Sequence, residues 1–324
     1  MITRRNALAS AAVLLAAPAM AQVLDRPVML VAPFSAGGAA DIAARIFAAH
    51  APRHMGAAPQ PIMVENRTGA SGAVGTQYVG RARPDGHTLL LARVGSSAIL
   101  PATDPRTPYG MEDFTWLALL DENPFVICVR ADAPWTTLEA LLSAIRAAPG
   151  RLNFSTSGPA TILDLGVRHM LAVSNLPIDA AQALPFRGGG EALTALLGGH
   201  AQFVGNNLGD MLGAIQQGQV LALVVSGDER LASLPGVPTA AEAGVPALSA
   251  LAGWNALAGP ANMPEPVVEF WTRVITATAH DPQWLAATRR IGSVPRLLSG
   301  AATAAHVAAQ IALYRELAQR LNLG

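Results

Sequence analysis

The feature that most constrains the fold is the regular alternation of short apolar runs with helical patterns. Apolar runs at 27–34, 60–67 and 87–94 have the composition of strands, and the segments 39–55 and 72–84 between them have that of helices. Strands joined through a helix lie parallel in one sheet and cross over in the right-handed sense. The series therefore predicts an α/β fold in which a mainly parallel sheet is flanked by helices.

A second series of the same kind opens with the strand-like run 124–132. A helical pattern at 136–150 follows, and either Thr136 or Thr137 is its expected N-cap. Four further strand-like runs lie at 152–158, 183–190, 201–207 and 221–227. The pattern changes again near 248–259, where we expect a crossing strand and a loop, and the segments 264–292 and 301–321 predict a helical tail.

Two such series predict two lobes with a cleft between them, which is a common place for a ligand. We expect lobe 1 to comprise residues 22–123 and 253–324, and lobe 2 to comprise residues 124–252. The chain has 324 residues, 51% of them hydrophobic, which is enough to build two cores.

Residues 1–21 have the features of a signal peptide. Arg4 and Arg5 precede a short apolar run, and Ala19-Met20-Ala21 is a small-x-small cleavage site. The arginine pair is compatible with either Sec or Tat export. We therefore expect a soluble periplasmic protein whose mature chain begins at Gln22.

The composition excludes several classes of function. The formal net charge is zero, which argues against a nucleic-acid partner. All 22 basic residues are arginine, so a Schiff-base lysine and a P-loop lysine are absent. The single cysteine, Cys128, lies in a strand-like run and is expected to be buried and structural. His50 and His54 have the i, i+4 spacing of a zinc-binding pair, but Pro52 lies between them and no HExxH motif occurs. No GxGxxG motif follows the first strand, so a dinucleotide cofactor is not expected.

Small or glycine-rich loops follow five of the predicted strands. The stretches FSAGGAAD, RVGSSA, STSGPAT, FRGGGEA and GNNLGD all lie at carboxyl ends of strands, where open α/β sheets bind ligands. Several precede a helix, so free backbone N–H groups and the positive end of the helix dipole suit the cleft to anions. Arg187 is the one basic residue inside such a loop; a carboxylate ligand and an outward-facing surface position are both compatible with it.

Two other residues leave alternatives open at this stage. Asp41 is either a ligand contact or a first-turn carboxylate that stabilises the helix start. Trp254, near the second crossing between the lobes, either lines the cleft or packs as a hinge aromatic.

The motifs VENRTGASGAVGT and LPGVPTAAEAG, in that order, resemble the periplasmic substrate-binding proteins of tripartite tricarboxylate transporters, the Bug family. The resemblance covers about Arg26 to Leu317. It implies a type II periplasmic binding protein fold, the two-lobe Venus flytrap, with no catalysis and no cofactor. It also implies a small carboxylate ligand, held largely by backbone N–H groups and bridging waters, and presentation to membrane subunits. We expect the protein to be a monomer.

The resemblance also implies a set of ligand-binding positions. In the loop after the first strand they are Phe34, Ser35, Ala36, Gly37, Gly38 and Asp41; after the third strand they are Ser96 and Ser97; and in lobe 2 they are Ser157, Thr161, Phe186, Arg187, Gly188 and Asn206.

This sequence departs from the common family pattern at several of these positions. Ser35 replaces a proline, Ala39 and Ala40 replace a hydroxyl pair, and Phe186 and Asn206 replace a tyrosine and an aspartate. The cleft should therefore be less polar than is usual and should take a carboxylate with an apolar or aromatic body. Two other functions remain open from the sequence, namely a ligand sensor for a membrane receptor kinase and a periplasmic hydrolase or transferase.

Overall fold

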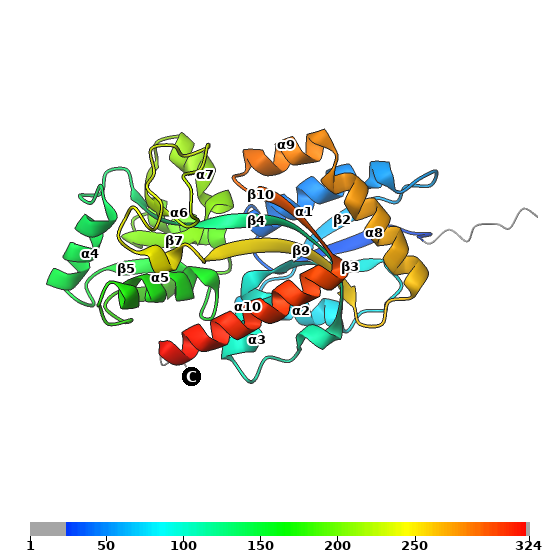
Figure 1. Cartoon of the computed structure of the whole chain (residues 1–324), viewed down its shortest axis with the longest axis horizontal. Helices are drawn as coiled ribbons and strands as arrows, with labels where there is room; N and C mark the ends of the chain where they lie inside the picture. Colours follow the sequence, from blue (N-terminus) through cyan, green and yellow to red (C-terminus); the bar gives the residue numbers. More distant parts are fainter. Residues whose placement is uncertain (1–23, 322–324) are drawn as a thin grey trace, which may run out of the picture.

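Two β-sheets that share one long strand form the frame of the molecule. The computed structural model describes residues 24–321 and places one sheet in each of two lobes, with the shared strand running between them (Figure 1). The predicted two-lobe α/β fold is confirmed. The predicted signal peptide, residues 1–21, lies outside the described residues.

The sheet of lobe 1 has the strand order β2-β1-β3-β9-β4, and β10 pairs with the far side of β4. Strand β1 pairs in parallel with β2 and β3, whereas β9 and β10 pair in the antiparallel sense. The strands are β1 Val28–Ala32, β2 Ile62–Asn66, β3 Thr88–Arg93, β4 Phe114–Arg130, β9 Ala252–Pro260 and β10 Val294–Ser299.

The sheet of lobe 2 repeats this arrangement with the order β6-β5-β7-β4-β8. Strand β5 pairs in parallel with β6 and β7, and β4 pairs antiparallel with β7 and β8. Parallel pairing is thus limited to three strands of each lobe. The crossing strands β4 and β9, together with β8 and β10, add antiparallel pairs, so the sheets are mixed and not mainly parallel as the sequence predicts. The strands are β5 Asn153–Thr156, β6 Gln182–Pro185, β7 Phe203–Asn207 and β8 Val220–Val225.

Strand β4 is much longer than the sequence predicts, because it begins at Phe114 and not at Pro124. It pairs with β9 as far as Pro124 and with β7 and β8 from Phe125 onward. Proline has no N–H for a sheet ladder and is tolerated where pairing is interrupted. Pro124 therefore lies within the strand, at the point where β4 changes partners.

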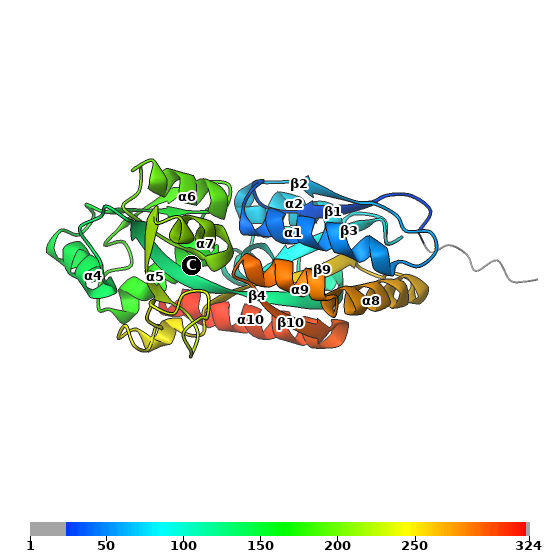
Figure 2. The same cartoon turned by 90° about the horizontal axis from the view of Figure 1, so that it is seen from above.

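Helices cover both faces of the two sheets (Figures 1 and 2). Thr137 caps helix α4 by accepting a hydrogen bond from Ala140 N at 3.2 Å, as one of the two predicted caps. The α-helices are α1 Ala39–His50, α2 Ala73–Gly80, α3 Leu100–Thr103, α4 Leu138–Ala147, α5 Ile162–Val173, α6 Gly189–Leu197, α7 Leu208–Gln216, α8 Glu265–Ala279, α9 Pro282–Arg290 and α10 Gly300–Arg320. Short helical turns lie at η1 Ala51–His54, η2 Ala70–Gly72, η3 Gly95–Ile99, η4 Met111–Asp113 and η5 Pro246–Leu248.

The sequence predicts a helical tail at the C-terminus. The structure differs, because strand β10 lies between helices α9 and α10. Helix α10 packs along β4 and η3 and extends toward lobe 2 (Figure 1). Trp254 is buried beneath it, with its ring 5.9 Å from that of His306. Of the two roles considered for Trp254, packing near the crossing is the one its contacts support.

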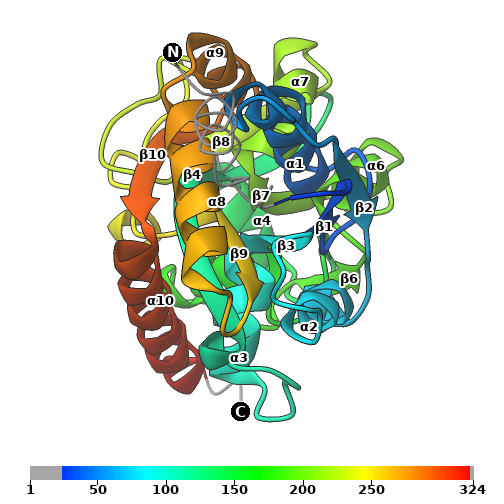
Figure 3. The same cartoon turned by 90° about the vertical axis from the view of Figure 1, so that its right-hand side faces the viewer.

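Two hydrophobic clusters lie on opposite faces of the lobe 1 sheet. One contains Phe47 of α1, Trp271 of α8 and Trp284 of α9, and the other includes residues of α2 and α10 and continues into lobe 2. Figure 3 shows helices α1, α8, α2 and α10 around the strands of lobe 1. Cys128 is fully buried in this second cluster, as predicted, and its burial raises the pKa of the thiol. None of the described helices is both long and apolar enough to cross a lipid bilayer.

Candidate functional site

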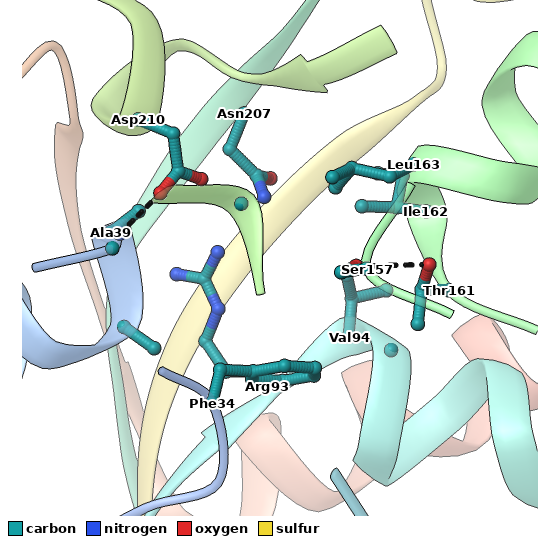
Figure 4. A pocket seen from close by; sticks show the side chains of 14 residues that line it. Phe34, Ala39, Arg93, Val94, Ser157, Thr161, Ile162, Leu163, Asn207 and Asp210 are labelled. Carbon is teal, nitrogen blue, oxygen red and sulfur yellow. Dashed lines mark hydrogen bonds between the residues drawn. The ribbon is translucent and has the colours of Figure 1, made fainter. Parts of the chain in front are cut away.

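A small cavity with a volume of about 30 Å³ lies between the two lobes. Its walls are the loops and helix starts that follow β1 and β3 in lobe 1, and β5, β6 and β7 in lobe 2 (Figure 4). These are the five loops to which the sequence draws attention. Of the predicted site residues, Phe34, Gly38, Ser157 and Thr161 line the cavity directly.

The loop after β1 turns sharply at Gly37, whose φ of 78° favours glycine. Ala36 and Gly37 are exposed, and Ser35 is buried with no hydrogen-bond partner for its Oγ among the described residues. Asp41 accepts a hydrogen bond from Gly37 N at 2.9 Å and pairs with Arg45. Burial raises the pKa of Asp41, but Arg45 and Gly37 outweigh it and hold the pKa below its usual range. Asp41 therefore stabilises the loop and the start of α1.

Ser96 and Ser97 are buried in η3, directly after the cavity-lining residue Gly95. Tyr109 donates a hydrogen bond to the Ser96 carbonyl at 2.6 Å, which fixes the turn. Neither serine hydroxyl has a hydrogen-bond partner among the described residues. The structure places both residues behind the cavity wall.

In the loop after β5, two predicted residues bond to each other. The Ser157 hydroxyl donates to Thr161 Oγ1 at 3.0 Å, and the Thr161 hydroxyl donates to the Gly158 carbonyl at 2.8 Å. Thr161 is also the N-cap residue of α5, although its side chain makes no capping bond. These hydroxyls line the lobe 2 side of the cavity with their donors already engaged.

The loop after β6 places its predicted residues differently. Phe186 is partly exposed and Arg187 is exposed, and both lie outside the cavity lining. Gly188 is buried against lobe 1, and a Cβ atom there would lie 2.4 Å from Ser35 Oγ. Asn206 is fully buried and donates from Nδ2 to the Gly189 carbonyl at 3.1 Å, which supports the loop from beneath.

Arg93, at the end of β3, is a cavity-lining residue that the sequence reasoning missed. Its side chain is only 4% exposed, and its one hydrogen bond among the described residues runs from Nη1 to Asn255 Oδ1 at 2.5 Å. Burial lowers the pKa of the guanidinium, and the charges of Asp210 and Asp121 oppose that effect. Its signal in the sequence is a single charge at the end of an otherwise apolar strand, directly before a small-residue loop.

Asn255, the hydrogen-bond partner of Arg93, belongs to a buried network that also contains Asp121 and Asn123. Asp121 Oδ1 accepts hydrogen bonds from Asn255 Nδ2 at 2.7 Å and from Asn123 Nδ2 at 2.9 Å. Burial raises the pKa of Asp121 to about 6, although these amides and Arg93 partly compensate. The network joins β3, β4 and β9, so the guanidinium is held by the frame of lobe 1.

Asp210, in the first turn of α7, is the second cavity residue that was missed. Its Oδ1 accepts a hydrogen bond from Ala39 N, at the N-terminus of α1 in the other lobe, at 2.6 Å (Figure 4). Removal from water raises the pKa of Asp210, while the Ala39 N–H, the Arg93 charge and the Asn207 amide act in the opposite direction. A carboxylate of lobe 2 thus occupies the helix end that attracts anions in lobe 1.

The cavity has a polar end and an apolar end. Arg93, Asn207 and Asp210 gather at one end, whereas Val94, Ile162 and Leu163 lie toward the other (Figure 4). No histidine, cysteine or glutamate is among the described residues that line it, and the Ser157 hydroxyl is committed to Thr161. The arrangement suits the binding of a small charged molecule with an apolar portion.

Two lobes joined by crossing strands, with a polar cavity enclosed where they meet, define a two-lobe solute-binding protein. The chain belongs to the family described as "Tripartite tricarboxylate transporter family receptor", whose model matches residues 43–323. This confirms the resemblance noted in the sequence.

Known relatives agree with this assignment. Protein BugT of Bordetella pertussis is 29% identical over 305 residues, which is 92% of this chain and 90% of BugT. The solved structure of the periplasmic binding protein BugD has a TM-score of 0.87 at 26% identity, covering 93% of this chain and 99% of BugD. These similarities imply a periplasmic solute-binding protein and lend no support to the hydrolase, transferase or sensor alternatives.

Two further solved structures contain ligands. MatC from Rhodopseudomonas palustris with bound malate has a TM-score of 0.84 at 28% identity, covering 90% of this chain and 98% of MatC. Rpa4515 from R. palustris with adipate has a TM-score of 0.86 at 27% identity, covering 92% of this chain and 97% of Rpa4515.

Proposed function

We propose that this protein captures a small organic carboxylate between its lobes and delivers it to the membrane subunits of a tripartite transporter, without catalysing a reaction. The observation that carries the proposal is the buried guanidinium of Arg93, which lines the cavity and has only one hydrogen-bond partner among the described residues. A carboxylate can accept two parallel hydrogen bonds from such a group. The carboxylates bound by MatC and Rpa4515 support the same ligand class.

The walls of the cavity favour a carboxylate with an apolar body. Phe34 and Val94 from lobe 1 and Ile162 and Leu163 from lobe 2 supply apolar surface on both sides of the space. Burial of an apolar group against these side chains contributes about 25 cal/mol for each Å² removed from water. A compact tricarboxylate such as citrate would have to bury further charge against the same walls, at a large cost.

Ligand titration tests the proposal directly. We expect isothermal titration calorimetry to detect saturable binding of C4–C6 or aromatic carboxylates, and the ligand that binds should raise the melting temperature. Binding restricted to highly polar acids such as citrate would refute the apolar-body interpretation. The absence of binding by every carboxylate would refute the ligand class.

Two arginines provide a matched comparison. Arg93→Gln removes the charge inside the cavity, and we expect carboxylate affinity to fall at least tenfold, since hydrogen bonds to charged groups contribute about 1.5–3 kcal/mol. Arg187→Gln removes the exposed loop arginine and should change the affinity less than twofold. If the loop variant loses binding and the cavity variant keeps it, the ligand carboxylate lies at Arg187 instead.

Export and assembly complete the proposal. Residues 1–21 would direct the chain to the periplasm through Sec or Tat and then be cleaved near Ala21. We expect the mature protein to be a monomer, because each lobe supplies half of one cavity and a single chain completes it. N-terminal sequencing of protein from a periplasmic extract and size-exclusion chromatography with light scattering check these two points.

A further inference from the structure

Two side chains of opposite charge face the same cavity from opposite lobes. Arg93 comes from β3 of lobe 1 and Asp210 from α7 of lobe 2 (Figure 4). Each charge influences the other, yet no direct hydrogen bond or ion pair joins them among the described residues. The cavity therefore presents a cation and an anion, each held by its own lobe.

Both groups keep bonding capacity for a ligand. Arg93 donates one hydrogen bond, to Asn255, out of the five that a guanidinium can make. Asp210 Oδ1 accepts from Ala39 N, and the Asn207 amide lies close enough to lower the pKa of the carboxyl. An ionised carboxylate has about four acceptor sites, so the Asp210 carboxylate can also accept from a ligand. A charged group that is largely removed from water is costly unless it is paired. One ligand with two opposite charges would pair both groups at once.

We infer that the ligand is a small apolar α-amino acid, or a zwitterion of the same shape. Its carboxylate binds Arg93, and its ammonium group donates to the Asp210 carboxylate. Its side chain extends toward Val94, Ile162 and Leu163 at the other end of the cavity. Because the cavity measures only about 30 Å³ here, the lobes must stand farther apart around the bound molecule. The inference rests on the proposed function and narrows its ligand class to carboxylates that also carry a positive charge.

Asp210 also joins the two lobes, because it accepts a hydrogen bond from Ala39 N. A test must therefore distinguish recognition of the ligand by Asp210 from stabilisation of the contact between the lobes. A residue that only holds the lobes together would strengthen the binding of every ligand to a similar extent. A residue that recognises an ammonium group strengthens only those ligands that carry one. Asp210→Asn separates the two, because the amide oxygen still accepts from Ala39 N while the negative charge is lost.

The experiment compares each amino acid with the acid that lacks only its amino group. The pairs are L-alanine with propanoate, L-valine with 3-methylbutanoate, and L-phenylalanine with 3-phenylpropanoate, each titrated calorimetrically at pH 7.5. In at least one pair we expect the amino acid to bind at least tenfold more tightly. Asp210→Asn should weaken that amino acid at least tenfold and change its partner less than threefold. Arg93→Gln should weaken both members of the pair.

Glu191→Gln serves as the control, since it removes a first-turn carboxylate of the neighbouring helix α6 that lies outside the cavity lining. It should leave every affinity within twofold. Equal or tighter binding of the acid in every pair that binds would overturn the inference. So would binding of malate or adipate when no amino acid binds, although the proposed function would then stand. Failure of all carboxylates, zwitterions included, would contradict the proposed function itself.

Discussion

Gly188 offers a way to perturb closure of the lobes without perturbing the fold of either lobe. Its backbone is extended, with φ of 176°, so alanine fits the local conformation. A Cβ atom at Gly188 would lie 2.4 Å from Ser35 Oγ and 3.0 Å from Ser35 N, and its third-nearest neighbour is Ser35 Cβ at 3.4 Å. All three atoms belong to lobe 1, so Gly188→Ala should act only when the lobes meet.

The size of the effect follows from these distances. The Ser35 hydroxyl can rotate away from the added methyl group, whereas the backbone atom Ser35 N cannot. To restore an ordinary contact of 3.4 Å with Ser35 N, the lobes must move apart by about 0.4 Å. The same displacement would lengthen the 2.6 Å hydrogen bond between Ala39 N and Asp210 Oδ1 to about 3.0 Å, which weakens it. Because a hydrogen bond to a charged group contributes about 1.5–3 kcal/mol in full, its weakening should lower ligand affinity by up to about tenfold.

Calorimetric titration of the best ligand measures this loss, and thermal unfolding of the ligand-free protein measures the fold. We expect Gly188→Ala to lose affinity and keep the melting temperature of the wild type. Adding Ser35→Gly, which removes the hydroxyl but leaves Ser35 N in place, should restore little of the affinity. Gly213→Ala is the control, since a Cβ atom at this position of α7 would have no neighbour within 4 Å, and it should stabilise the protein by about 0.5–1 kcal/mol without affecting binding. Wild-type affinity in Gly188→Ala would refute the proposed contact between the lobes.

Three further predictions concern other parts of the molecule. The pKa of Asp121 is raised from 3.8 to about 6, so its contribution to stability is fully present below pH 3.8 and is lost as the pH rises through 6. The free energy of unfolding of Asp121→Asn, relative to that of the wild type, should therefore rise by about 1–3 kcal/mol between pH 4 and pH 8. Chemical denaturation measures this difference, and a difference that does not change with pH would contradict the raised pKa of Asp121. Thr137→Ala removes the cap of α4 and should lower the free energy of unfolding by about 1 kcal/mol, with ligand affinity unchanged in titration. The buried Cys128 thiol should react with a thiol reagent only in denaturant, and rapid reaction of the native protein would show that its strand opens.

Much of the fold follows from local patterns that the sequence displays openly. The runs that become β1, β2 and β3 are apolar and bounded by proline, glycine or polar residues, and the Thr137 cap marks the start of α4. Strand β10 could not be found in this way. It is short, mostly exposed and contains Pro295, and it is ordered by its pairing with β4, which lies some 170 residues earlier in the chain.

In the candidate site, too, the sequence predicts features set by neighbouring residues and misses those set by contacts between distant segments. The glycine loop after β1 is visible because a strand, a tight turn and a helix follow each other directly. Arg93 and Asp210 were missed because each has an ordinary local explanation, as a charge at a strand end and as a first-turn carboxylate. Their shared position depends on the meeting of two lobes, which brings Asp210 to Ala39 across 171 residues. Arg187 was considered as a carboxylate ligand because it lies in a glycine-rich loop, but it is exposed in the structure.

The pairing of β3 with β9 sets the moment in biosynthesis at which the cleft can become functional. The strands of lobe 2 are made between β4 and β9, whereas the guanidinium of Arg93 is oriented by Asn255, which follows it by 162 residues. A nascent chain that ends before β9 has all the loops of the cavity but lacks the partner that orients its cation. Ligand capture is therefore a property of the finished polypeptide, and truncation before residue 252 should abolish it in one step.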